Sequence, residues 1–144
     1  MVDGTSYEVG DTSHRFTIQS MSKPLTYAMA LDELGVDTVG ARIGLEPTGD
    51  PFNAISLDPA TGQATNAMVN AGAITAADLL HGLHRDGARQ HLLDGYSKFA
   101  GRPLTIDDRV AESERVTGHR NRAIAHLLRG AGSMGTTTPP RRCA

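Results

Sequence analysis

The sequence predicts an α+β fold, in which a short N-terminal β-hairpin precedes a mostly helical domain. Two segments near the start, 6–9 and 16–19, are rich in strand-forming residues, and Gly10 and Asp11 between them are typical of a turn. From Ser20 onwards, apolar residues recur instead at the three- and four-residue spacing of a helix. The chain has 144 residues, which is enough for one domain with its own core.

Helical spacing predicts a series of helices, of which the first begins near Ser20 and ends at Gly35. Thr105 followed by Asp108 resembles a capping box with Asp in place of Glu, and it would open a helix that fades near residue 114. Gly118 interrupts that run. The remaining predicted helices span 37–43, 71–83, 88–100 and 121–129.

Two stretches of the sequence predict no regular structure. Residues 44–67 are rich in Pro and Gly, and irregular segments of that length inside a domain are usually functional. Residues 132–144 include a Thr, Pro and Arg run with no periodicity and no face that could be buried. We therefore expect a domain over residues 1–131 and a disordered tail over residues 132–144.

Composition argues against several classes of partner. A formal net charge of -2 gives no electrostatic reason to expect binding to nucleic acid or to an acidic membrane. The apolar runs are far shorter than the roughly 20 residues that span a bilayer, and residues 1–4 lack the features of a signal peptide. The single cysteine, Cys143, cannot form an internal disulfide. We expect a cytoplasmic protein.

Ser20 and Lys23 form a Ser-x-x-Lys pair at the start of the first predicted helix. Positions three apart share a helix face, so the two side chains would stand together. A serine hydroxyl needs a base to become a nucleophile, and a lysine can act as that base if burial lowers its pKa. The motif is typical of serine β-lactamases and penicillin-binding proteins. The alternative is that Ser20 caps the helix and Lys23 is an ordinary solvated side chain.

The histidines raise the possibility of a metal site. His81 and His84 are three residues apart, but no cysteine or well-spaced acid completes a set of ligands along the sequence. We therefore expect no metal, and we interpret the histidines as residues on helix surfaces. They are His14, His81, His84, His91, His119 and His126.

Several blocks of sequence resemble, in the same order and at matching separations, the catalytic domain of the glutaminase family. The opening block includes FTIQSMSKPL at residues 16–25 and AMALDELG at residues 28–35. Later blocks lie at 44–53, 66–74, 113–114 and 118–125. The likeness covers about residues 3–130, and ordered blocks of this kind are more specific than one short motif.

The resemblance implies a fold related to serine β-lactamases and penicillin-binding proteins, with helices packed beside an antiparallel sheet. It also implies hydrolysis of L-glutamine to L-glutamate and ammonia without a cofactor. Ser20 would attack the side-chain carboxamide, and its backbone N–H would supply half of an oxyanion hole. Lys23 would take the serine proton and later help to protonate the ammonia. Water would then hydrolyse the glutamyl ester.

Asn70, Glu114 and Asn121 match positions at which the family binds its substrate. Glutamine carries an ammonium and a carboxylate on one carbon, so Glu114 could pair with the ammonium while the two amides bond the polar ends. Each residue also has a structural alternative. Asn70 and Asn121 could cap helices, and Glu114 could be a solvated carboxylate beside Glu112.

The chain also departs from the family pattern. The family has a tyrosine upstream of the first strand, which this sequence does not contain. Downstream, the family has further active-site tyrosines, a Lys-Ser-Gly strand and the second oxyanion-hole donor, whereas the resemblance here stops near Gly132. We therefore expect a partial domain with an incomplete sheet and impaired catalysis, whose parent enzyme is a homo-oligomer, either a dimer or a tetramer. The alternatives are a non-enzymatic remnant and a penicillin-recognising enzyme that shares Ser-x-x-Lys.

Overall fold

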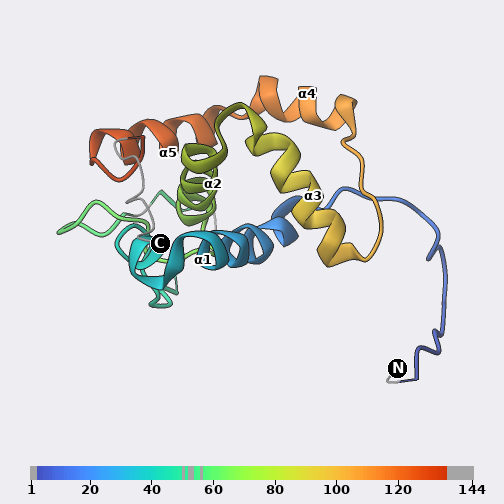
Figure 1. Ribbon diagram of the computed structural model, residues 1–144. Coiled ribbons are helices and arrows are strands. Elements are labelled where there is room, and N and C mark those ends of the chain that lie inside the picture. Colours follow the sequence, from blue (N-terminus) through green and yellow to red (C-terminus); the bar gives the residue numbers. More distant parts are fainter. Residues whose placement is uncertain (1–2, 50, 52–53, 56, 136–144) are drawn as a thin grey trace.

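The protein is a cluster of helices, described here by a computed structural model for residues 3–49, 51, 54–55 and 57–135. Helix α2 is central and packs against α1, α3 and α5 (Figure 1). In chain order the elements are η1 (Gln19–Met21), α1 (Ser22–Gly40), α2 (Asn70–His84), η2 (Arg85–Gly87), α3 (Ala88–Ala100), α4 (Asp108–Thr117) and α5 (His119–Gly130). None of the described helices is both long enough and apolar enough to cross a membrane.

The predicted N-terminal hairpin is wrong. Neither 6–9 nor 16–19 forms a strand, and the N-terminal segment leads away from the helices (Figure 1). The predicted turn is present, because the Thr12 N–H donates to the Gly10 carbonyl. The apolar side chains Tyr7 and Val9 are 79% and 93% exposed. A two-stranded hairpin is marginal in water unless one face is covered, and nothing in the described chain covers this one.

β pairing elsewhere in the described residues is limited to two isolated bridges. Ile43 pairs with Ala64 in parallel, and Leu57 pairs with Ala64 in antiparallel orientation. The part of segment 44–67 that the structure describes is otherwise irregular, as the sequence predicts. The predominantly helical character agrees with the predicted fold class, whereas the β part of that prediction finds no strand among the described residues.

Helix α1 is interrupted at the predicted position. Gly35 has φ 80° and ψ 161°, which are outside the helical region and which glycine adopts without a steric penalty. The chain then returns to helical conformation, and α1 ends at Gly40. We predicted a separate helix over 37–43 for this second part. The change of direction brings Val39 and Ile43 into the core, where both are fully buried.

The predicted bounds of α2 and α3 are confirmed to within a residue, but the cap of α4 is not the predicted one. Asp107, rather than Thr105, precedes α4 and caps it. Its Oδ1 accepts hydrogen bonds from the backbone N–H groups of Arg109 and Val110, each at 3.1 Å. Helix α4 then continues to Thr117, beyond the predicted end.

The core consists of two small clusters that are rich in alanine. One lies between α1, α2 and the loops that follow α1, and the other joins α2 to α5. Small side chains let the backbones approach closely: a Cβ added at Gly72 would lie 2.0 Å from the Asn66 carbonyl oxygen. The first cluster contains Met29, Ala30, Val39, Ile43, Ala67, Ala76 and Leu80, and the second contains Ala64, Val69, Ala71, Ile124 and Leu128.

The start of the predicted tail packs against the domain. The Ser133 side chain is buried, and its hydroxyl donates to the Gly62 carbonyl at 2.9 Å. The Gly135 N–H donates to Asp78 Oδ2 at 3.0 Å. The rest of the predicted tail, residues 136–144, lies outside the described residues.

Candidate active site

Lys23 reaches from the first turn of α1 to the start of α2. Its Nζ donates hydrogen bonds to the Met68 carbonyl at 3.0 Å and to Asn70 Oδ1 at 2.7 Å. The residue is only 9% exposed, and desolvation lowers the pKa of its ammonium below the usual lysine value. Lys23 is therefore buried, and the alternative interpretation of it as an ordinary solvated side chain is wrong.

Asn70 occupies the centre of a polar chain that joins three helices. It is the first residue of α2, and the residue in the N-cap position is Val69, so Asn70 does not cap the helix. While its Oδ1 accepts from Lys23, its Nδ2 donates to Asn121 Oδ1 at 3.1 Å. Asn121 lies in the first turn of α5, whose N-cap is Gly118. The structure thus brings Lys23, Asn70 and Asn121 together from positions far apart in the sequence.

Ser20 lies in the short 3-10 turn that leads into α1, and it is exposed. The residue before it, Gln19, has φ 46°, a left-handed conformation that is uncommon for a residue other than glycine. The Ser22 hydroxyl donates to the Gln19 carbonyl at 2.8 Å and so supports this turn. Strained backbone of this kind is found at functional sites more often than elsewhere. Sequence reasoning placed Ser20 at the helix start but did not anticipate the strain.

Helix α3 contacts α1 one turn beyond Lys23. The Thr26 hydroxyl donates to the Ser22 carbonyl at 2.8 Å and is 2.6 Å from the Tyr96 hydroxyl. Tyr96 lies within the helix predicted over 88–100, but the sequence pattern did not mark it as a site residue. The signal that could have identified it is its hydroxyl, because a half-buried tyrosine usually bonds a polar partner.

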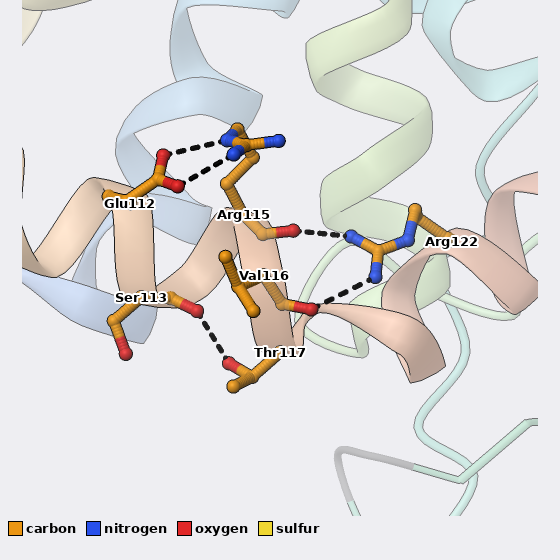
Figure 2. A network of polar contacts seen from close by, with 6 residues as sticks. All are labelled: Glu112, Ser113, Arg115, Val116, Thr117 and Arg122. Atoms are coloured by element: carbon orange, nitrogen blue, oxygen red, sulfur yellow. Dashed lines mark hydrogen bonds and ion pairs between the residues drawn. The ribbon is translucent and has the colours of Figure 1, made fainter.

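Glu114 is not brought to the other candidate residues by any contact. Its side chain is exposed on α4 and forms no hydrogen bond or ion pair with the described residues. Its neighbours fix the α4–α5 junction instead (Figure 2). Glu112 pairs with Arg115 through two hydrogen bonds of 2.6 and 2.7 Å. Arg122 of α5 donates to the carbonyl oxygens of Arg115 and Val116, in the last turn of α4, at 2.7 and 3.3 Å.

The burial of Lys23 suits a role in proton transfer. A buried amine with a lowered pKa can accept a proton at a pH where an ordinary lysine cannot. The serine that it would serve lies one turn earlier, on an exposed and tight turn. The two asparagines add amide donors and acceptors of the kind that bind polar organic ligands.

A second polar cluster lies on the same helices and includes two of the histidines. Glu33 of α1 contacts both His84 of α2 and His91 of α3. An acid therefore does complete a set of possible metal ligands, although it is remote from both histidines in the sequence.

Comparison with known proteins gives the family. The sequence matches the glutaminase family model over residues 1–141. It is 46% identical over 135 residues to a glutaminase of Clavibacter michiganensis subsp. michiganensis, covering 92% of this chain and 40% of that protein. The chain spans about 40% of the length of this relative, and also of a glutaminase from Nostoc to which it is likewise 46% identical.

Solved structures give the same result. The probable glutaminase ybaS matches with a TM-score of 0.83 at 39% sequence identity, covering 92% of this chain and 43% of that one. Mglu, solved in its L-glutamate binding form, matches with a TM-score of 0.79 at 40% identity, covering 90% of this chain and 29% of that one. The chain therefore belongs to the glutaminase family.

Proposed function

We propose that this chain carries part of the active site of a glutaminase that hydrolyses L-glutamine to L-glutamate and ammonia. The observation that carries the proposal is the buried Lys23, hydrogen-bonded to Asn70, which in turn bonds Asn121. A serine on an exposed turn lies three residues before that lysine, in a chain that belongs to the glutaminase family.

In the proposed reaction, Ser20 Oγ attacks the side-chain carbonyl carbon of glutamine while its proton passes to neutral Lys23. The tetrahedral intermediate collapses when the C–N bond breaks, and the proton from Lys23 leaves with the nitrogen as ammonia. Water then attacks the glutamyl ester and releases glutamate and the serine hydroxyl. The burial that lowers the Lys23 pKa supports the first step, because it raises the fraction of lysine that can accept a proton.

Asn70 and Asn121 are proposed to bind the polar end of the substrate. Each amide can donate to a carboxylate, and their mutual hydrogen bond orients both groups. Glu114 is proposed, from the resemblance, to pair with the α-ammonium, and its carboxylate has no competing partner among the described residues. The L-glutamate bound by the relative Mglu is the product of this reaction and supports an amino-acid site.

The proposed domain, residues 1–131, belongs to a larger fold in which the helices cover an antiparallel sheet. The exposed apolar side chains Tyr7, Val9 and Phe16 support this, because exposed apolar surface often marks a face that another part of a protein covers. We also propose, from the resemblance, that the parent enzyme is a homo-oligomer. Light scattering of the parent enzyme tests that assembly.

Trapping the acyl intermediate tests the proposed function. The chain is mixed with L-glutamine, quenched in acid and mapped by peptide mass spectrometry. We expect a glutamyl adduct on the peptide that contains Ser20, absent from Ser20→Ala and retained in the matched control Ser13→Ala. A glutamyl adduct on another residue, or one that persists in Ser20→Ala, would overturn the assignment of the nucleophile.

A further inference from the structure

The contacts of Glu33 point to a site that the glutamine chemistry does not use. His84 Nε2 is 2.5 Å from Glu33 Oε2, and His91 Nε2 is 2.6 Å from Glu33 Oε1. The two imidazole rings are stacked with centroids 3.7 Å apart and planes 19° from parallel. Each carboxylate oxygen therefore faces one ring nitrogen, and both rings present the same type of nitrogen in the same direction.

We propose that Glu33, His84 and His91 form a binding site for a divalent transition-metal ion such as Zn²⁺. The candidate ligand atoms all lie within 4.8 Å of one another. Two imidazole nitrogens and one carboxylate oxygen are a ligand set that zinc uses in proteins, with water completing the tetrahedron. Imidazole ligands favour Zn²⁺, Cu²⁺ and Ni²⁺ over the oxygen-loving Mg²⁺ and Ca²⁺.

The present distances are those of hydrogen bonds, and metal binding would replace the shared protons. For tetrahedral Zn²⁺ with bonds of about 2.0–2.1 Å, neighbouring ligand atoms lie roughly 3.3 Å apart. Each nitrogen and oxygen would therefore separate by roughly 0.7 Å, a movement that rotation of the long Glu33 side chain can supply. The two stacked rings would also have to tilt apart so that both Nε2 lone pairs point at the ion. The side chains are 21–33% exposed, so an ion in solution can reach them.

The electrostatics favour a cation at this position. Burial raises the pKa of Glu33, but the hydrogen bonds from His84 and His91 outweigh that effect, and the net pKa lies below the usual glutamate value. The carboxylate is therefore ionised at neutral pH.

The site would act as a structural clamp. Glu33 lies on α1, His84 ends α2 and His91 is in the first turns of α3. The same α1 carries Lys23 at its start, and the same α2 begins with Asn70. A bound ion would therefore fix the relative positions of the two helices that present these side chains, without contacting them.

Zinc titration of the tag-free chain tests the proposal, in a Cys143→Ser background that removes the only thiol. Binding is measured by competition with a chromophoric chelator. We expect one ion per chain, an affinity more than about tenfold weaker in Glu33→Gln, His84→Gln and His91→Gln, and no change in the matched control His81→Gln. His81 lies on the same helix but is exposed and outside the cluster. Undiminished affinity in Glu33→Gln would overturn the site, as would no binding.

A second measurement does not depend on whether the variants fold. Co²⁺ replaces Zn²⁺ in such sites, and four-coordinate Co²⁺ absorbs visible light far more strongly than the hydrated ion. We expect the Cys143→Ser chain with otherwise native sequence to give the intense four-coordinate spectrum. A spectrum identical to that of hydrated Co²⁺ would contradict the proposal.

Discussion

The two ends of α2 carry polar clusters of different character, although both connect α2 to α1. At the first residue, Asn70 links a buried lysine to the amide of Asn121. At the last residue, His84 shares the Glu33 carboxylate with His91 in a partly exposed position. The first cluster combines one amine with neutral amides, which suits a polar organic substrate. The second concentrates a negative charge between two imidazoles, which suits a proton or a metal cation.

In the two proposals above, one pair of helices separates chemistry from structural support. Burial at the start of α2 alters the proton affinity of a lysine. Hydrogen bonding at the other end keeps a carboxylate ionised despite its partial burial. Substitutions at the two ends should therefore affect different properties of the molecule: reactivity at the start of α2, and stability at its end.

The largest expected effect is on activity, from Lys23→Met. The substitution removes the proposed base but keeps a side chain of similar length. We expect glutamine hydrolysis to fall by about 10²–10⁴-fold, the usual contribution of a general base. Ammonia release measured at saturating glutamine tests this.

The matched control for Lys23→Met is Lys98→Met, because Lys98 is the only other lysine and is exposed on α3. Unchanged activity in Lys23→Met would remove the lysine from the mechanism.

The pH dependence of folding stability gives a second test of Lys23. Because the Lys23 pKa is lowered, the folded state binds fewer protons than the unfolded state between the folded pKa and 10.5. Stability relative to Lys23→Met should therefore rise with pH in that window.

The next effect is on substrate binding, from Asn70→Ala. The substitution removes the acceptor of the Lys23 hydrogen bond and the donor to Asn121. We expect KM to rise by about tenfold, corresponding to one lost hydrogen bond of roughly 1.4 kcal/mol. Steady-state kinetics measure this, and a double-mutant cycle with Asn121→Ala should show coupling of at least about 0.5 kcal/mol. Additive effects of the two substitutions would argue against a shared site.

A moderate effect on stability is expected from Glu33→Gln without added metal. Loss of the charged hydrogen bonds to His84 and His91 should cost about 1.5 kcal/mol, near the low end for such bonds because the group is partly exposed. The Glu33 pKa is lowered, so its contribution is fully present above the unfolded value near 4.5 and is lost as pH falls through the folded pKa. Urea unfolding at pH 7 and pH 3 tests this. An equal cost at both pH values would contradict the assignment.

The smallest effect is expected from Asp107→Ala, which removes the cap of α4. The loss should be about 1 kcal/mol, measured by urea unfolding monitored by circular dichroism. Thr105→Ala is the matched control, and it should have little effect because Thr105 does not cap the helix. The reverse order of effects would restore the capping box that the sequence suggested.

Local sequence patterns predicted the helices well, because helical spacing and glycine stops act over a few residues. The bounds of α2 and α3 and the interruption at Gly35 are of this kind. The prediction of a hairpin failed because a strand forms only where a partner pairs with it, and local residue preferences do not report that partner. The prediction of the α4 cap failed for another reason. Thr105 and Asp107 are both good capping residues, and local spacing does not decide between them.

Of the candidate site, the sequence predicted the residues but not their contacts. Lys23 was identified by the Ser-x-x-Lys spacing, and Asn70 and Asn121 were identified by resemblance. The structure joins the three by hydrogen bonds across 47 and 51 residues of chain. Glu33 escaped notice because it meets its histidines across 51 and 58 residues. No local pattern reports such a contact, since the packing of three helices creates it.

The measurement that tests the central claim most directly is ammonia release from L-glutamine by the purified chain and by its Ser20→Ala variant. The account predicts release that depends on Ser20 and that survives Ser13→Ala. Equal release by the chain and by Ser20→Ala would contradict it, because the hydrolysis would then proceed without the proposed nucleophile.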